Sequence, residues 1–258
     1  MSLKMVNGRA VHFPKGEKFE WDEEVAAVFP DMARRSIPLY RQMHELHAMI
    51  VLRAARERCG CEERKDLFTY RVADVGASYG EFLRCIQDNR HLAGEAKLSL
   101  SAYEPSRHMR TAIEHHVPGA YVYEHALGGN EIGCKGGFDA VACHYTLQFV
   151  PEEKQLWAIN ELKDMVAPGG IFLFAQKDDY QDFIPQFIKG PVSDHYLQFR
   201  RDNGYSDQEI AEKTRALKGA MNTMPASQIR HLIRPGFTIM ADTVRMGQFG
   251  AFVAVKDV

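Results

Sequence analysis

A buried strand that runs directly into a glycine-rich turn is the feature that most constrains this chain. Residues 72–75 form an apolar run with one carboxylate, Asp74, and Gly76 and Gly80 interrupt the chain before a helical pattern resumes at residue 81. Glycine adopts the positive φ of a tight turn and lets the backbone approach a ligand closely. The pattern therefore predicts a strand–turn–helix unit of an open α/β sheet, with a ligand over the turn.

Strands and helices alternate along the rest of the chain. Apolar runs predict strands at residues 70–75, 98–103, 121–123, 138–143, 171–175, 237–245 and 249–256. Amphipathic stretches predict helices at residues 81–89, 106–115, 152–165, 206–220 and 227–233. Because a short turn joins the last two strands, they form a hairpin at the end of a sheet that is otherwise parallel. The sequence thus predicts an α/β fold with a seven-stranded, mostly parallel sheet and a C-terminal antiparallel hairpin.

The segment before the first predicted strand has a different character. Residues 1–20 are polar and predict a loose arm, and residues 22–29 predict a short helix that Pro30 closes. Ser36 and Pro38 predict the start of a long amphipathic helix, because a serine caps the first turn and proline suits an early helical position.

These patterns divide the chain in two. Residues 1–66 form an N-terminal arm and helical lid, and residues 67–258 form the sheet domain that carries the ligand site. Within that domain, residues 178–203 are rich in aromatic side chains and are predicted to be irregular.

Three predicted strands end in groups that suit a ligand. Asp74 ends the first strand, Glu104 follows the second and is itself followed by Pro105, and His144 follows the fourth. Ligands of doubly wound sheets bind outside the carboxyl ends of the strands, so we expect these groups around one crevice. Structural roles are the alternatives: Asp74 can cap the next helix, and His144 can be a packed histidine.

Composition argues against several functional classes. The net charge of −2 gives no basic footprint for nucleic acid. The five cysteines are an odd number, and Cys59 and Cys61 lack a second Cys or His pair at zinc spacing, so we expect no disulfide framework and no metal site. No apolar run suits a membrane span or a signal peptide, which favours a cytoplasmic protein.

The Asp-x-Gly-x-x-x-Gly spacing of residues 74–80 resembles the first motif of class I S-adenosyl-L-methionine (SAM) methyltransferases. SAM carries a sulfonium cation and no phosphate, so its loop needs a carboxylate at the strand end rather than a bare helix N-terminus. The glycine spacing and the final hairpin both disfavour an NAD dehydrogenase. The resemblance implies the Rossmann-like fold of these enzymes, with residues 67–258 as the SAM-binding domain.

The resemblance to this class also implies how the strand ends meet SAM. Glu104 stands where an acid accepts both ribose hydroxyls, and Pro105 leaves the adenine edge apolar. His144 lies below the expected position of the sulfonium. We expect Asp74, Gly76 and Glu104 to position the nucleoside.

Three further stretches resemble one family of this fold. They are residues 27–32 with 35–40 (AVFPDM and RSIPLY), residues 145–149 (YTLQF) and residues 199–206 (FRRDNGYS). These stretches resemble the carboxy-S-adenosyl-L-methionine (carboxy-SAM) synthase family, which serves wobble-uridine modification of tRNA. The first and third stretches are specific, and the likeness runs in order from about residue 19 to the C-terminus.

This family resemblance implies a reaction and an assembly. The family converts SAM and prephenate into carboxy-SAM and phenylpyruvate: the SAM methyl group loses a proton, and the resulting ylide captures the carbon dioxide released from prephenate. The implied ligand is SAM or carboxy-SAM, and the implied small-molecule substrate is prephenate. The implied assembly is a homodimer in which the N-terminal helices and residues 186–205 cover the pocket.

The family resemblance further implies roles for single residues. Tyr40 matches a tyrosine that reaches into the cofactor site. Gly76, Ala77 and Ser78 match the loop that contacts the methionine portion, and Gly80 completes this loop.

Arg201 matches the arginine that pairs with the added carboxylate. A carboxylate on the methyl carbon offers a bidentate, charge-assisted partner that a methyl group cannot offer. The alternative is a surface position in which Arg201 pairs with Asp202 or Glu209.

Three positions depart from the family pattern. Glu104 and Pro105 replace an Asp-Asn pair, and Ala126, beside Leu127, stands where an acid near the adenine is usual. His144 replaces an asparagine. These changes leave open a relative that binds plain SAM or uses another carboxyl donor.

The leading hypothesis is a carboxy-SAM synthase with Arg201 and Tyr40 as catalytic residues. The second is an ordinary SAM-dependent methyltransferase acting on a small molecule or an RNA, with His144 as the base. The third is a nucleoside-binding scaffold without catalysis.

Overall fold

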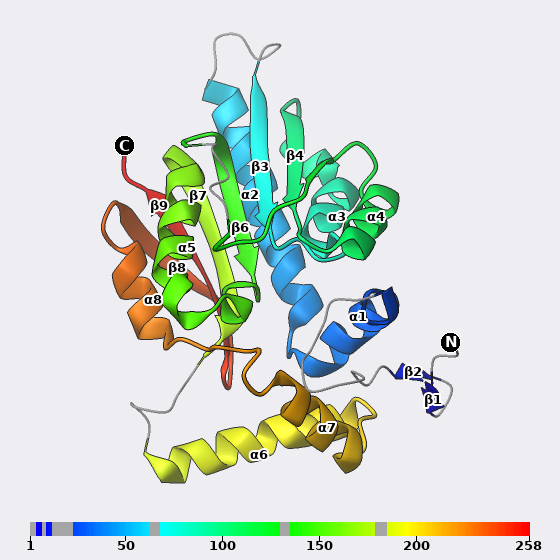
Figure 1. The fold of residues 1–258 in the computed structure, drawn as a ribbon. Coiled ribbons are helices and arrows are strands. Elements are labelled where there is room, and N and C mark those ends of the chain that lie inside the picture. The colour runs from blue at the N-terminus through cyan, green and yellow to red at the C-terminus, as the bar shows by residue number, and fades with distance from the viewer. Residues whose placement is uncertain (1–3, 7–8, 12–22, 62–67, 130–134, 179–184) are drawn as a thin grey trace.

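A seven-stranded sheet with the order β5-β4-β3-β6-β7-β9-β8 forms the centre of the computed structural model (Figure 1). The structure describes residues 4–6, 9–11, 23–61, 68–129, 135–178 and 185–258. The strands of the sheet are β3 (Thr69–Val75), β4 (Lys97–Tyr103), β5 (Tyr121–Tyr123), β6 (Phe138–His144), β7 (Val166–Lys177), β8 (Phe237–Met246) and β9 (Phe249–Lys256). Each of the seven predicted strands is confirmed.

The pairing of the strands also confirms the predicted sheet. The pairs β3–β4, β3–β6, β4–β5 and β6–β7 are parallel, whereas β9 pairs antiparallel with both β7 and β8. The chain moves outward from β3 to β5 and then returns to β6 on the other side of β3. This reversal opens a crevice at the carboxyl ends of β3 and β6, where doubly wound sheets bind their ligands.

Helices cover both faces of the sheet (Figure 1). They are α2 (Tyr40–Cys61), α3 (Glu81–Asp88) and α4 (Arg107–His116) with the 3-10 turn η1 (Arg90–Ala93) on one face, and α5 (Glu152–Met165) and α8 (Ala226–Ile233) on the other. Each face has its own apolar core, built around side chains such as Leu52 and Phe82 on one side and Ile159 and Phe172 on the other. The two buried faces explain why β6 is buried at all seven positions.

Further helices lie beyond the carboxyl ends of the strands (Figure 1). They are α1 (Glu23–Ser36), α6 (Gln186–Asp202) and α7 (Asp207–Leu217), and the 3-10 turn η2 (Leu147–Phe149) follows β6. Most of the predicted N-terminal arm lies outside the described residues, but β1 (Lys4–Val6) and β2 (Arg9–Val11) pair antiparallel within it. No helix in the described part of the chain is long and apolar enough to cross a membrane.

The predicted helix boundary at Pro30 is wrong. Helix α1 continues through Pro30 to Ser36, and α2 begins at Tyr40 after a turn in which Leu39 has a φ of 57°. A proline inside a helix removes one backbone hydrogen bond. Packing outweighs this cost, because α1 buries Val25 and Ala33 against separate apolar clusters on either side of the proline.

The prediction that residues 178–203 are irregular is also wrong where the structure describes them. Helix α6 spans seventeen residues and contains Gly190 and Pro191, two residues that weaken any helical signal in the sequence. Tertiary contacts override the local preference: the Tyr196 ring packs 5.1 Å from that of Phe249, and Arg200 is buried.

Candidate functional site

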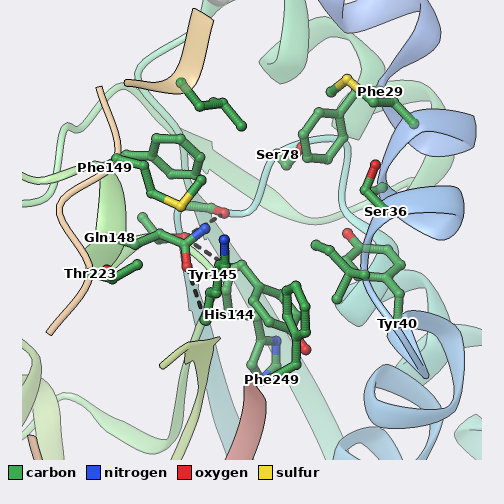
Figure 2. Close-up of a pocket in the computed structure, with 18 of the residues that line it drawn as sticks. Phe29, Ser36, Tyr40, Ser78, His144, Tyr145, Gln148, Phe149, Thr223 and Phe249 are labelled. Atoms are coloured by element: carbon green, nitrogen blue, oxygen red, sulfur yellow. Dashed lines mark hydrogen bonds between the residues drawn. The ribbon is translucent and has the colours of Figure 1, made fainter. Parts of the chain in front are cut away.

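A cavity of about 850 Å³ lies at the carboxyl ends of the central strands, beneath α1, α6 and α7. Its volume is near the upper end of the range for small-molecule sites, about 300–1,000 Å³. Figure 2 shows Phe29, Ser36 and Tyr40 on one side of the cavity and Gln148, Phe149 and Thr223 on the other.

The turn after β3 brings backbone to the cavity wall. Gly76 has a φ of 73°, and its N–H donates to the carbonyl of Tyr103 at 2.8 Å. A Cβ at Gly76 would collide with the side chain of Thr146. Ser78 of the same turn also has a positive φ, 53°, and lies near Phe29 in Figure 2. The glycine is thus required both by its backbone angle and by the space available.

The second strand end places a carboxylate beside this turn. Glu104 is 7% exposed, and its two oxygens accept the backbone N–H groups of Ser78 (2.8 Å) and Ser106 (2.9 Å). Burial raises the pKa of Glu104 to about 7, although these two hydrogen bonds and Arg110 act to lower it. The remaining lone pairs of the carboxylate can accept hydroxyl donors from a ligand.

Asp74 is the second carboxylate of the cavity wall. It is 3% exposed, and burial, with a smaller contribution from Glu104, raises its pKa to about 8. Two buried carboxyl groups therefore share one cavity. A ligand that donates hydrogen bonds or carries positive charge stabilises their ionised forms.

A cluster of three histidines lies beneath the end of β6. His144 Nε2 and His47 Nδ1 are 2.9 Å apart, and His47 Nε2 lies 2.7 Å from Thr243 Oγ1. The His44 ring packs edge-on, 5.0 Å from that of His144, and no described residue forms a hydrogen bond with the Nδ1 atom of His144. His44 and His144 line the cavity.

Burial keeps these histidines neutral. It lowers the pKa of His44 to about 4 and that of His47 to about 3, and it lowers the pKa of His144 well below its usual value. A neutral imidazole beside the cavity can pack against a cation without charge repulsion, whereas its low pKa makes it a poor proton acceptor. No group of three or more His, Cys, Asp or Glu suited to a metal ion occurs among the described residues.

Ten of the twelve residues proposed from the sequence line this cavity. They are Tyr40, Asp74, Gly76, Ala77, Ser78, Glu104, Pro105, Ala126, Leu127 and His144. The ring of Tyr40 packs 4.4 Å from that of His44, and its hydroxyl, which burial above all keeps protonated, has a pKa well above its usual value. Gly80 lies behind the wall, where it precedes α3 with a φ of 85°.

Arg201 does not line the cavity of its own chain. Its side chain is 44% exposed, and its Nε donates to a carboxylate oxygen of Asp207 at 2.7 Å. Successive helical residues point about 100° apart, and Arg200 is the one that faces the cavity. Within one chain Arg201 therefore takes the surface position given as the alternative, paired with Asp207, and its role toward a carboxylate stays a prediction.

A cationic wall, which no sequence pattern indicated, lies on the side of the cavity formed by α1, α6 and α7. Arg200 and Lys213 line it from α6 and α7, and Arg35 lies beside them at the end of α1. Lys213 is within the predicted helix 206–220, but nothing local indicates which way it faces. The adjacent arginines Arg200 and Arg201 were visible in the sequence. Only the recognition of α6 as a helix would have shown that they face different directions.

Known structures with a similar backbone define the class of protein. An O-methyltransferase family protein from Burkholderia thailandensis superposes with a TM-score of 0.58 at 13% identity, over 92% of this chain and 61% of that one. The SAM-bound amino pentose methyltransferase of calicheamicin biosynthesis from Micromonospora echinaspora has a TM-score of 0.56 at 14% identity, over 93% and 99%. The fold is that of the class I SAM-dependent methyltransferases.

Sequence relatives are more specific, although no protein-family model matches the chain. A carboxy-SAM synthase from Aeromonas hydrophila is 30% identical over 249 residues, which cover 92% of this chain and 90% of the relative. One from Campylobacter hominis is 28% identical over 246 residues, covering 93% and 95%. The chain belongs to the carboxy-S-adenosyl-L-methionine synthase family, and it is a SAM-dependent transferase.

The residues of the cavity fit SAM. The turn at Gly76, Ala77 and Ser78 lines the cavity, so its backbone can contact the methionine portion. Two buried carboxyl groups offer acceptors to the ribose hydroxyls and to the positively charged sulfonium. Pro105 and Leu127 supply an apolar surface for the adenine ring.

Proposed function

We propose that this enzyme is a carboxy-SAM synthase that uses prephenate as its carboxyl donor. Family membership over nearly the whole chain supports the proposal. The observation that carries it is a single cavity that joins a SAM-binding turn and two carboxylates to a wall of positive charge. A methyl group alone gives such a wall no partner, whereas an anionic second substrate does.

The proposed reaction balances without a base from the protein. Prephenate loses its ring carboxylate as carbon dioxide and its ring hydroxyl as hydroxide, so that the ring becomes aromatic and phenylpyruvate forms. The hydroxide takes a proton from the SAM methyl group and leaves as water, and the ylide carbon attacks carbon dioxide to give carboxy-SAM. The protein then contributes positioning, electrostatics and exclusion of bulk water.

Each cavity residue has a place in this proposal. Asp74, Gly76 and Glu104 hold the nucleoside, and Ala77 with Ser78 contacts the methionine portion. The adenine ring lies against Pro105, Ala126 and Leu127. Tyr40 and His144 flank the sulfonium.

The proposed role of Arg201 requires a second copy of the chain. Its guanidinium turns away from the cavity of its own chain, so it can pair with the added carboxylate only by reaching the cavity of a partner. We therefore propose a homodimer. Two further expectations accompany it: a cytoplasmic location, from the sequence pattern, and service to tRNA wobble-uridine modification, from the family resemblance.

Mass spectrometry of the bound ligand tests the proposed function. Purified enzyme is incubated with SAM and with prephenate labelled isotopically in its ring carboxylate, and the ligand is then released. We expect a nucleoside heavier than SAM by one labelled carbon dioxide. Unmodified SAM or S-adenosylhomocysteine alone, with prephenate present, would instead indicate an ordinary methyltransferase.

A further inference from the structure

The side of the cavity formed by α1, α6 and α7 gathers more positive charge than the described residues neutralise. Arg35 is paired, because its Nε and Nη2 atoms lie 2.7 and 2.6 Å from an Asp31 oxygen. Among the described residues, no carboxylate pairs with Arg200 or Lys213. These two side chains come from different helices and face the same cavity.

Arg200 is the more deeply buried of the two. It is 7% exposed, its guanidinium stacks over the Tyr196 ring at 4.6 Å, and its Nε–H finds no hydrogen-bond acceptor in the part of the chain that the structure describes. A buried guanidinium donor without an acceptor is costly, because it has left water and gained no partner. This point of the cavity wall therefore suits an anionic group of a ligand.

Lys213 extends the same subsite. Its Nζ donates to Ser36 Oγ at 2.6 Å and lies 5.3 Å from the centre of the Tyr205 ring. Burial first, and then the neighbouring guanidinium groups of Arg200 and Arg35, lower the pKa of Lys213 to about 7. An anion bound between Lys213 and Arg200 favours the charged ammonium and so reverses this effect.

The chemistry of the proposed donor decides which anion fits. Prephenate has two carboxylates: the ring carboxylate leaves as carbon dioxide, and the carboxylate of the oxoacid side chain remains in phenylpyruvate. A pair of cations stabilises a carboxylate and opposes its conversion into neutral carbon dioxide. The cationic wall therefore suits the carboxylate that stays.

We propose that Arg200 and Lys213 form a subsite that binds the retained oxoacid carboxylate of the donor, and so hold the ring carboxylate toward the SAM methyl group. This assignment rests on the proposed function. Because the contact persists from substrate to product, it contributes to the affinity for donor and product alike. Its loss should raise the KM for prephenate much more than it lowers kcat.

Calorimetry with phenylpyruvate tests the subsite without turnover. Phenylpyruvate is titrated into enzyme saturated with S-adenosylhomocysteine, for the wild type and for Arg200→Gln, Lys213→Met and Arg200→Lys. We expect about a tenfold or greater loss of phenylpyruvate affinity in the first two variants and partial recovery in Arg200→Lys. Arg215→Gln, an exposed arginine on the same helix as Lys213, is the matched control and should bind as the wild type does.

Affinity for S-adenosylhomocysteine is measured in the same variants and should not change. A weakened S-adenosylhomocysteine affinity with unchanged phenylpyruvate affinity would place the cations at the methionine carboxylate and overturn the subsite. Absence of phenylpyruvate binding in the wild type would also overturn it. If the wild type forms carboxy-SAM while Arg200→Gln keeps full phenylpyruvate affinity, the proposed function stands and this inference fails.

Proton uptake gives an independent readout. Near neutral pH, phenylpyruvate binding should draw a proton onto Lys213, so the observed heat should depend on the ionisation enthalpy of the buffer. The groups that face Lys213 are Ser36 and Arg35 from α1, Arg200 from α6 and the Tyr205 hydroxyl. Lys213→Met should abolish the uptake; uptake that persists in this variant would count against the assignment.

Discussion

Asp74 and Glu104 hold protons at a pH where exposed carboxyl groups have lost them. Their pKa values of about 8 and about 7 result mainly from burial, and the proximity of Glu104 adds to the shift of Asp74. The affinity of this site for a ligand therefore depends on pH, because pH sets the protonation of Asp74 and Glu104. A ligand that binds the ionised carboxylates must first displace their protons.

We predict that SAM affinity falls as the pH is lowered from about 8 to about 6. Above both pKa values the two groups are already ionised and affinity is complete; below them each must release a proton, which weakens binding by up to about tenfold per pH unit for each group. Calorimetry at constant ionic strength measures this, and Asp74→Asn should remove the upper part of the dependence. An affinity that is constant over this range would exclude the ionised forms as SAM acceptors.

Gly76 makes a second residue-scale prediction. An alanine there meets the side chain of Thr146 in addition to adopting a φ of 73°. Gly119 has a similar φ of 85° but open space around it, and is the matched control. We expect Gly119→Ala to lower the free energy of unfolding by about 1 kcal/mol and Gly76→Ala by about 3 kcal/mol. Urea denaturation of both variants measures the two losses. An equal loss of unfolding free energy in Gly76→Ala and Gly119→Ala would show that the Thr146 side chain moves aside without cost.

Helix α7 depends on its first turn. Ser206 Oγ accepts the N–H of Glu209 at 3.2 Å, and the Glu209 carboxylate accepts the N–H and hydroxyl of Ser206, each at 2.7 Å. This capping box satisfies donors that the start of a helix otherwise leaves free. It also fixes the helix that carries Lys213.

We predict that Ser206→Ala lowers the free energy of unfolding by about 1 kcal/mol. Ser206→Thr keeps the hydroxyl and is the control, with an expected loss of only a few tenths of a kcal/mol. Chemical denaturation of both variants tests the cap. Equal stability of the alanine variant and the wild type would show that tertiary packing alone holds α7.

Local patterns were sufficient for the sheet and for most helices around it. The strands are apolar runs bounded by turn residues, and Asp74 lies on the same continuous stretch of sequence as the glycine-rich turn. The helices α1 and α6 were mispredicted because Pro30 and Pro191 suppress the local signal, whereas distant contacts stabilise both helices. The side that a residue faces can be predicted only once its segment is recognised as a helix. Because α6 was not recognised, the sequence could not show that Arg200 rather than Arg201 faces the cavity.

The cationic wall could not be predicted from the sequence because its residues are far apart along the chain. Ser36 and Lys213 are 177 positions apart and meet only because α1 and α7 close over the same strand ends. Motif spacing describes a single loop well. Motif spacing carries no information on residues that are distant in sequence and come into contact only in the folded protein.

At the scale of the whole molecule, the histidine cluster joins three distant elements. His47 of α2 contacts His144 of β6 and Thr243 of β8, which lie 97 and 196 positions away. The cluster is stable only while its rings are neutral, because burial lowers their pKa values. Folded-state values below the unfolded value mean that stability is complete above about pH 6.5 and is lost as the pH falls below it.

We predict that acidification from about pH 7 to about pH 5 costs the wild type about 2 kcal/mol more unfolding free energy than it costs His47→Gln. Asp74 and Glu104 act in the opposite direction, but they are present in both proteins and cancel in the comparison. Urea denaturation at the two pH values measures the difference. An identical acid-induced loss in both proteins would show that His47 accepts its proton without unfolding.

The position of β9 between β7 and β8 governs the order in which the molecule can assemble. During synthesis, β7 leaves the ribosome with one edge unpaired, and this edge stays open while the 71 residues between β7 and β9 emerge. Phe249, the first residue of β9, is part of the cavity wall (Figure 2). A nascent chain thus has no finished pocket until β9 is inserted, and its open edge needs protection until then.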